Sequence, residues 1–216
     1  MPQHAVSQKA KQRLKTEKRI LEAAAAIFSE DGFAGARMDA IAKRASVNKA
    51  TIYYHIGNKK ALYARVLHDV FSGTVDTIER RLAKSSSPEE KLRIYVRGLI
   101  LKIEANPHVP RIMMRELATG GTHLPDDAVD DFVNMFAMLS RIMDEGVRMD
   151  RFHETFPPLL HLMTVGTAIL VKNLRNLSGR HADIRRVQDL ERFLAENAKE
   201  EIEKLVLRAV MKPIPD

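Results

Sequence analysis

Apolar residues recur with the 3.6-residue period of an α-helix along almost the whole chain, and no segment alternates convincingly between apolar and polar positions as a half-buried strand would. The first helical segment carries Ile20, Ala24 and Phe28 on one face and is followed by Gly32, a common helix-ending residue. The pattern predicts an all-α chain of about nine helices, at residues 15–31, 38–45, 49–56, 58–84, 88–105, 108–118, 125–149, 157–177 and 182–211.

Polar residues at the ends of these segments support the predicted boundaries. Asn48 and Asn58 can each cap the helix that follows, and Gly57 can end the third helix. Ser87, with Pro88 at the first helical position, is typical of another helix start.

The second and third predicted helices are short, and only Ser46-Val47-Asn48 joins them, which is the pattern of a helix-turn-helix. Short helices need tertiary support, and a small core is available from Phe28, Ile41, Ala42, Val47 and Ile52. This core leaves the outer face of the third helix free. Side chains suited to phosphate, sugar and thymine methyl groups gather there: Lys49, Thr51, Tyr53, Tyr54, His55 and, just beyond, Lys59.

The formal net charge of +7 is unevenly distributed along the chain. Residues 1–84 hold 16 Lys and Arg against 8 Asp and Glu, a net of +8, whereas residues 85–216 hold 19 against 20, a net of −1. On charge alone, the basic part could bind nucleic acid or an acidic membrane surface, or could be an ordinary basic surface. The helix-turn-helix pattern favours DNA.

The segment from Arg19 to Leu67 closely resembles the DNA-binding region of the tetracycline-repressor (TetR) family of bacterial transcription regulators. The resemblance covers about a quarter of the chain and rests on Ile20-Leu21-Glu22-Ala23-Ala24, Phe28, Gly32-Phe33, Ile41-Ala42, Ala45, Val47-Asn48-Lys49, Thr51-Ile52-Tyr53-Tyr54-His55, Lys59 and Leu62. It implies a three-helix DNA-binding domain at residues 13–73 and a helical effector-binding and dimerisation domain at residues 74–216. The second domain fits the family only in layout.

The resemblance implies a role for each matching position. DNA-backbone contacts would come from Lys49, Tyr53, Tyr54, His55 and Lys59, with Arg37 and Met38 at a further phosphate position. Lys49, Ala50 and Thr51 would lie close to base edges. Two alternatives stay open: Tyr53 packs in the small core instead, and His55 is an ordinary surface residue.

Three positions depart from the family pattern. Arg37 and Met38 stand where Thr or Ser is common, so a hydroxyl cap is lost while a cation is gained. Ser46 replaces the usual turn glycine, which would cost up to about 1 kcal/mol if this backbone needs a positive φ. Ile56 replaces the usual Phe and is a smaller core residue.

The chain begins with a basic segment. Residues 1–12 are predicted to be a disordered arm, and the run from Lys9 to Arg19 holds six cations against one carboxylate. As an alternative, this run folds onto the DNA backbone or into the minor groove, where it would release counterions.

Methionine and other apolar residues are concentrated on the faces of the C-terminal helices. They either fill gaps in the core or line an adaptable apolar ligand cavity, which the resemblance favours. The candidate lining residues are Met113, Met114, Leu117, Phe132, Met135, Phe136, Leu139 and Met163, with polar anchors from among Arg115, Glu116, Asn134, His161 and Thr167.

Segment 157–171 is apolar nearly all round, so it must be buried on both sides. In the family layout, the last two long helices pair with those of a second copy. The candidate interface residues are Gly166, Leu170, Leu174, Leu194, Ile202 and Leu205. Two copies of the helix-turn-helix would then read a palindromic operator with half-sites about 34–36 Å apart.

Several other classes of function are disfavoured. The chain has no cysteine, no legible catalytic constellation and no glycine-rich phosphate loop, although a metal site assembled from distant helices stays open. The uncharged stretch Phe156 to Val171 is shorter than a membrane-spanning helix and contains two prolines and a histidine. Without a secretory signal, the cytoplasm is the expected location.

The sequence therefore predicts a homodimeric regulator that binds double-stranded operator DNA, with no cofactor, no metal, no membrane partner and no enzymatic activity. We expect a repressor that a small apolar or amphipathic ligand releases. The alternatives are a ligand-independent architectural DNA-binding protein and an enzyme that uses the C-terminal cavity.

Overall fold

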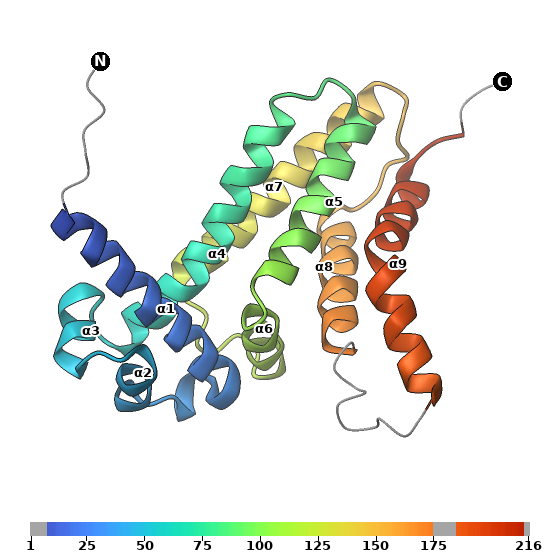
Figure 1. Ribbon diagram of the computed structural model, residues 1–216. Coiled ribbons are helices and arrows are strands. Elements are labelled where there is room, and N and C mark those ends of the chain that lie inside the picture. Colours follow the sequence, from blue (N-terminus) through green and yellow to red (C-terminus); the bar gives the residue numbers. More distant parts are fainter. Residues whose placement is uncertain (1–7, 175–184, 214–216) are drawn as a thin grey trace, which may run out of the picture. The chain divides into compact units, whose positions relative to one another are not determined.

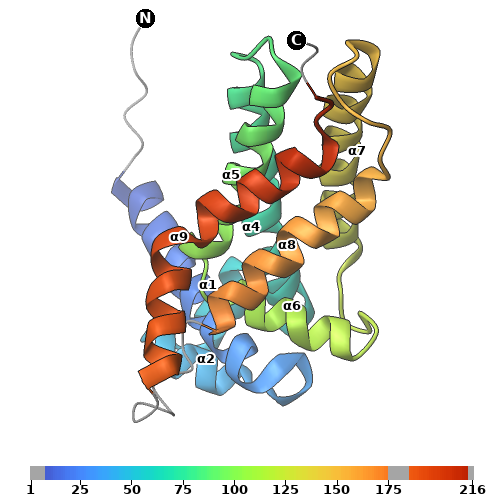
Figure 2. The ribbon, with the colours of Figure 1, turned by 90° about the vertical axis from the view of Figure 1, so that its right-hand side faces the viewer.

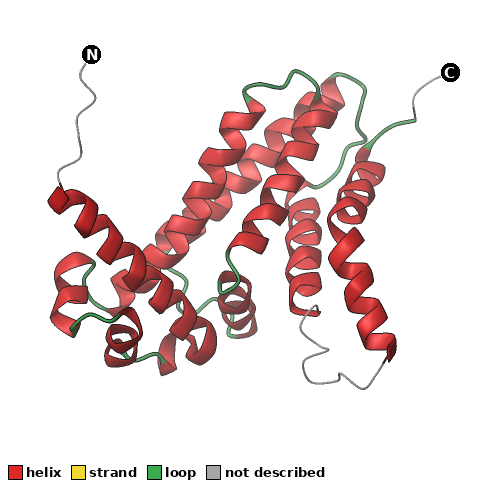
Figure 3. Ribbon diagram, in the orientation of Figure 1, coloured by secondary structure: helices red, strands yellow, loops and turns green. Residues whose placement is uncertain are grey.

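The computed structural model describes residues 8–174 and 185–213. Over these residues it is built from helices, with no β-structure beyond a single bridge between Phe152 and Met211 (Figures 1 and 3). The elements are α1 (Gln8–Gly35), α2 (Met38–Ala45), α3 (Lys49–His55), α4 (Lys59–Leu82), α5 (Pro88–Ala105), α6 (Val109–Ala118), α7 (Asp126–Arg148), α8 (Pro157–Leu174) and α9 (Arg185–Val210). The all-α prediction is confirmed. Among the described helices, none combines the length and apolar character needed to cross a membrane.

Local side-chain chemistry sets several of the helix boundaries, as the sequence predicts. The Asn48 side chain accepts a hydrogen bond from the Thr51 N–H at 2.7 Å, and Asn58 accepts from the Ala61 N–H at 2.9 Å. Ser87 accepts from the Glu90 N–H at 3.2 Å, with Pro88 at the start of α5. These caps satisfy backbone donors that have no partner inside their own helices.

The first helix differs from the prediction at both ends. Residues 8–12 are helical rather than disordered, because α1 continues toward the N-terminus with internal contacts such as Thr16 Oγ1 to the Gln12 carbonyl at 3.0 Å. At the other end, Gly32 (φ 70°, ψ 177°) is non-helical and breaks the helix as predicted, but helical residues follow it as far as Gly35. Several predicted features lie outside the described residues: residues 1–7 of the arm, residues 175–177 of the eighth helix, the break at 178–179 and residues 182–184 of the last helix.

The structure divides into two compact units. The first contains residues up to 70 together with residues 108–129, so α6 and the turn after it group with α1, α2 and α3 rather than with the second predicted domain. The second contains residues 71–107 and residues from 130 onward. α4 belongs to both, since the division falls between Val70 and Phe71.

Aromatic rings form the centre of the first unit. The ring of Tyr63, on α4, lies edge-on to Phe28 and Phe33 of α1, with centroids 4.8 and 5.0 Å apart. Such packing adds about 0.5–1.5 kcal/mol per pair beyond the area buried. Phe28 and Tyr63 are fully buried, as are Ile41 and Ile52 of the predicted small core.

A buried carboxylate fastens α6 to this centre. Glu116 is 3% exposed, and its side chain accepts from the Tyr63 hydroxyl at 2.7 Å and from the His123 N–H at 3.1 Å. Burial, together with this hydrogen bond, raises the pKa of Tyr63, so the phenol stays protonated and donates. α6 also meets α1 where Arg115 donates to the Glu30 carbonyl at 2.6 Å. These links connect residues far apart in the sequence.

In the second unit, α5 packs against both α8 and α9, which lie side by side in front of it in Figure 2. Phe71 of α4 and Phe132 of α7 add a pair of rings tilted by 46° to one another, with centroids 4.7 Å apart. Ion pairs tie the helices together at the periphery, including Lys91 to Glu145 at 2.7 Å.

Gly146 of α7 is enclosed by the ring of Phe152, which is fully buried. A Cβ at this position would lie 2.0 Å from Phe152 Cδ2, so Gly146→Ala forces the ring or the backbone to move. After the gain in helix propensity, we expect a net loss of about 2 kcal/mol in the free energy of unfolding, measured in urea. In the matched control Gly73→Ala, the nearest atom is the flexible end of Lys102 at 3.2 Å, and stability should hold or rise. A Gly146→Ala protein as stable as the control would contradict this account.

Candidate functional site

The turn between α2 and α3 fixes the geometry of the helix-turn-helix. Ser46 ends α2 in the left-handed conformation (φ 52°, ψ 48°), which confirms that the position occupied by the family's glycine needs a positive φ here too. Arg19 of α1 donates from one guanidinium nitrogen to the carbonyls of Ala45 and Ser46, the latter at 2.9 Å. A cation at the end of α2 is favourable because carbonyls are left free there.

We expect Ser46→Gly to raise the free energy of unfolding by about 0.5–1 kcal/mol. Glycine adopts this conformation without the Cβ penalty, and this gain exceeds the loss caused by the greater freedom of glycine in the unfolded chain. The measurement is urea unfolding at fixed protein concentration. Ser140→Gly is the control, since Ser140 lies inside the helix α7, where glycine should cost about 0.5 kcal/mol. Equal effects of the two substitutions would argue against strain at Ser46.

The outer face of α3 presents the predicted DNA-binding side chains to solvent. Tyr54 is 81% exposed and Tyr53 is 49% exposed, so Tyr53 is only half packed in the small core. Lys49 opens the helix, and its ammonium lies 3.1 Å from Asp39 Oδ2 of α2. Ala50 is exposed beside it. The Thr51 hydroxyl donates to Asn48 Oδ1 at 2.7 Å, so its acceptor lone pairs are what it can offer to a ligand.

Of the other predicted contact residues, Met38 and Lys59 contact other parts of the protein, whereas Arg37 is exposed. Met38 is 7% exposed and belongs to the core, so its backbone, at the start of α2, is what it presents. Lys59 donates to the Ala34 carbonyl at 3.1 Å and lies over the Phe33 ring, 4.8 Å from its centroid. Arg37 is exposed at the N-terminus of α2, and its side chain makes no capping hydrogen bond there.

Glu17 of α1 contacts the C-terminal end of α3. Its Oε1 accepts from Arg13 at 2.9 Å and lies 3.4 Å from His55 Nδ1. The hydrogen bond from Arg13, with a smaller contribution from His55, holds the pKa of Glu17 below its usual range. The carboxylate is therefore ionised at neutral pH and gives His55 a fixed partner.

In the second unit, the predicted cavity-lining residues divide into two groups. Met135 and Leu139 are buried along α7, with Phe132 and Phe136 half-buried beside them. Met163 of α8 is 54% exposed and does not join them. In the first unit, Met113 is buried, while Met114 and Leu117 are mostly exposed on α6. The structure brings the α7 residues together and turns Met114, Leu117 and Met163 toward solvent.

One predicted polar anchor lies deep among apolar residues. His161 of α8 is 2% exposed, and its Nδ1 lies 2.5 Å from the Tyr95 hydroxyl, which also donates to the Met135 carbonyl at 3.2 Å. Because the single hydroxyl proton of Tyr95 is used in its bond to the Met135 carbonyl, His161 Nδ1–H donates to the tyrosine oxygen. Nε2 of the neutral ring is then left as an acceptor. Burial lowers the pKa of His161 to about 4, so the ring is neutral at pH 7. Phe136 lies edge-to-face with it, with centroids 4.8 Å apart.

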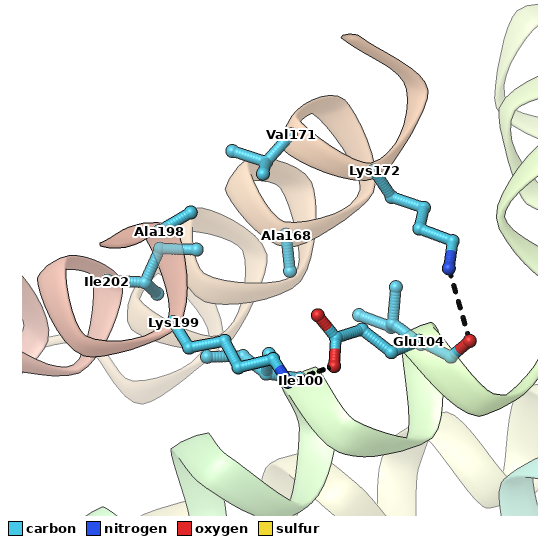
Figure 4. Close-up of a pocket in the computed structure, with 9 residues that line it drawn as sticks. Ile100, Glu104, Ala168, Val171, Lys172, Ala198, Lys199 and Ile202 are labelled. Carbon is cyan, nitrogen blue, oxygen red and sulfur yellow. Dashed lines mark hydrogen bonds and ion pairs between the residues drawn. The ribbon is translucent and has the colours of Figure 1, made fainter. Parts of the chain in front are cut away.

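A small hollow lies where α5, α8 and α9 meet (Figure 4). Ile100, Ala168 and Ile202 line it, and two lysines bind Glu104 at its rim: Lys172 donates to the carbonyl and Lys199 to the carboxylate. Its volume of about 10 Å³ is room for one water molecule rather than an effector. No cluster of three or more potential metal ligands occurs among the residues that the structure describes.

The predicted dimer residues fall mostly on an outward apolar face of α8 and α9. Leu170 and Leu205 are 56% and 61% exposed, and a Cβ on Gly166 would meet no atom within 4 Å. Leu174 and Leu194 are half-buried, whereas Ile202 is 6% exposed and packs inside the unit. The same outward face, which we call the α8–α9 face, also includes Met163, predicted to line a cavity, and four exposed residues for which the sequence predicts no role: Leu159, Leu162, Leu190 and Phe193.

The sequence does not predict the supporting contacts of Arg19, Glu17 and Glu116, and it offers Glu116 only as a polar anchor for a ligand. Each makes a contact with a residue 26 to 53 positions away, in addition to the local contacts of Glu17 with Arg13 and of Glu116 with the His123 N–H. A charged residue on a helix face gives no sign of which distant partner it meets. An acidic residue among the apolar positions of α6, as Glu116 is, is the one signal available in the sequence.

Known proteins share this N-terminal unit. Residues 20–66 match the family described as "Bacterial regulatory proteins, tetR family". The transcriptional repressor NicS of Pseudomonas putida is 30% identical over 115 residues, which is 53% of this chain and 54% of that protein. The repressor SCO4008 of Streptomyces coelicolor is 29% identical over 167 residues, 75% of this chain and 82% of that protein. The chain thus spans only about half the length of NicS.

Solved structures show the same fold over nearly the whole chain. A linker-substituted mutant of HlyIIR has a TM-score of 0.70 at 20% identity, covering 94% of this chain and 100% of that one. FadR of Bacillus subtilis, in complex with stearoyl-CoA, has a TM-score of 0.66 at 18% identity, covering 89% and 98%. AibR, in complex with isovaleryl coenzyme A and operator DNA, has a TM-score of 0.62 at 17% identity, covering 92% and 100%.

Proposed function

We propose that this member of the tetR family of bacterial regulatory proteins is a homodimeric transcriptional repressor, and that a small apolar or amphipathic ligand releases it from a palindromic operator. The observation that carries the proposal is the recognition helix α3, which presents Lys49 and the 81%-exposed Tyr54 on a unit whose residues 20–66 match the family. The relatives NicS and SCO4008 are themselves named transcriptional repressors.

DNA binding follows from the geometry of α2 and α3. In a helix-turn-helix, the N-terminal residues of the second helix contact base edges in the major groove and the first helix crosses the backbone. Lys49, Ala50 and Thr51 occupy the base-edge position, while Arg37, Tyr53, Tyr54, His55 and Lys59 serve the backbone, with the Met38 backbone beside them. The net charge of +8 on residues 1–84 supplies the long-range attraction to DNA. The basic start of α1 is a further candidate for phosphate contacts.

Dimerisation is proposed through the α8–α9 face. A row of leucines with Met163 and Phe193 is exposed there, and exposed apolar patches of this kind are typical of protein–protein interfaces. Gly166 leaves room for a partner helix to approach closely. Two copies would place two recognition helices for half-sites about 34–36 Å apart.

The ligand is proposed to bind among α5, α7 and α8 of the second unit. Met135, Leu139 and Phe136 supply apolar contacts there, and His161 Nε2 is an acceptor for a ligand donor. Binding would act on the first unit, which we call the head, through α4, whose residues 71–82 belong to the second unit and whose residues 59–70 belong to the first. A coupling free energy of about 1–3 kcal/mol would be typical, and DNA would weaken ligand binding by the same factor.

The test is to select duplexes from a random library with the full-length chain and to footprint the winners. We expect a palindromic sequence that is bound at least about 1,000-fold more tightly than random duplex. Equal affinity for selected and random duplexes would instead make the chain an architectural DNA-binding protein. Stearoyl-CoA and isovaleryl-CoA, the ligands of two structural neighbours, are the first probes for release.

A further inference from the structure

A carboxylate stands on the side of the head that is proposed to meet DNA. Asp39 lies in the first turn of α2 with its side chain 74% exposed, and its Oδ2 is 3.1 Å from the ammonium of Lys49, the first residue of α3. Other acids of the head pair elsewhere: Glu30 with Arg44, Glu22 with Lys18, and Asp69 with Arg65. Asp39 alone of these is paired with a residue proposed to lie at base edges.

An acid in this place has a cost when DNA binds. DNA presents phosphates along both strands, and a carboxylate beside them is repelled rather than bound. Position in the first turn of α2 and an exposed ion pair are each small stabilising effects. Neither effect requires the acid to be next to Lys49, since acids elsewhere in the first turn would serve α2 equally well.

The major groove offers a carboxylate one well-matched partner, the exocyclic amino group of cytosine, and it offers lysine the O6 and N7 atoms of guanine. The short distance between Asp39 Oδ2 and Lys49 Nζ carries both groups to the same place at the N-terminus of α3. A cytosine and a guanine that are paired or adjacent would therefore satisfy both side chains at once. A sequence without cytosine offers the carboxylate only the amino group of adenine, which stands beside the N7 acceptor of the same base.

We propose that Asp39 is a specificity-determining residue: with Lys49 it reads a G·C pair or step in each operator half-site and weakens binding to DNA that lacks it. This inference rests on the proposed function. It adds that the acid acts mainly by penalising wrong sequences, so its removal should increase the affinity of the head for random DNA while decreasing discrimination.

The experiment repeats the random-duplex selection with full-length wild type, Asp39→Ala, Asp39→Asn and the control Glu22→Gln, which removes one exposed acid of the same unit. Wild type and Glu22→Gln should select a G·C pair at a symmetric position in both half-sites. Asp39→Ala should lose that preference by about tenfold and bind random duplex about two- to fivefold more tightly at low salt. Asp39→Asn should shift the preference toward A·T, since an amide suits adenine.

Two results would overturn the inference in different ways. If both Asp39 variants select the wild-type sequence with the wild-type ratio of specific to random binding, Asp39 does not read DNA, although the proposed function stands. If wild type itself enriches no sequence, the proposed function fails and this inference falls with it. Circular dichroism and thermal unfolding of each variant check that the protein keeps its helix content and stability, and Asp39→Asn keeps the size of the side chain.

Discussion

Replacing Tyr54 or Lys49 with alanine should reduce operator affinity by about 30-fold to more than about 10,000-fold while the fold and the dimer remain intact. Tyr54 is 81% exposed and Lys49 pairs only with an exposed acid, so neither removal opens the core. A good contact to a base or its backbone contributes about 1–3 kcal/mol to the free energy of binding. A dimer would lose this contact in both half-sites, so the loss doubles before it is converted to a fold-change. Fluorescence anisotropy with the selected operator measures the loss.

Matched variants separate the contributions. Tyr54→Phe keeps the ring and removes the hydroxyl, so it should retain affinity if the ring packs on sugar or a methyl group and lose it if the hydroxyl binds phosphate. Lys204→Ala removes an exposed lysine of the second unit, paired with Glu201, and should leave affinity unchanged. Wild-type footprints from Tyr54→Ala and Lys49→Ala would refute the assignment of α3.

Lowering the pH from about 6.5 toward 4 should destabilise the protein through His161 by up to about 1.4 kcal/mol per pH unit. The imidazole is buried against Tyr95 and Phe136, and burial lowers its pKa to about 4. The unfolded chain binds a proton at this residue below pH 6.5, but the folded chain does not until about pH 4. The unfolded state is therefore favoured progressively across that window.

Urea unfolding at several pH values and fixed protein concentration measures this slope. In His161→Phe, the contribution should vanish, so wild type loses stability relative to the variant as pH falls. His153→Gln, which removes an exposed histidine of the same unit, is the control and should keep the wild-type slope. A constant difference between wild type and His161→Phe across pH 4–7 would show that this ring does not titrate as described.

Local chemistry explains which parts of the fold the sequence predicts. Asn48, Asn58 and Ser87 cap helices through the residues that follow them within a turn, and Ser46 needs its left-handed conformation because of the tight turn itself. Such features depend on neighbours in the sequence. Periodicity likewise places the described ends of the helices after α1 to within about three residues, whereas α1 starts seven residues earlier than predicted.

Contacts between distant residues could not be predicted in this way. The period of α8 and α9 identifies apolar positions but does not say which neighbour they face. It therefore does not predict that Ile202 is buried in the unit while Met163 is exposed to solvent. The same limit applies to Arg19, whose carbonyl partners lie 26 and 27 positions later, and to Glu116, whose partner Tyr63 lies 53 positions earlier. These partners depend on the tertiary fold.

The grouping of α6 with the N-terminal helices makes the head a discontinuous domain. During synthesis, the Tyr63 hydroxyl has no partner until Glu116 of α6 has been made. Because α5 lies between α4 and α6 in the chain, the head is complete only after α5 has also been synthesised. A chimera that joins this head to a different C-terminal domain needs three junctions, near residues 70, 108 and 129. A single junction at residue 73 would transfer α3 without α6, whose Glu116 binds Tyr63 at the centre of the head.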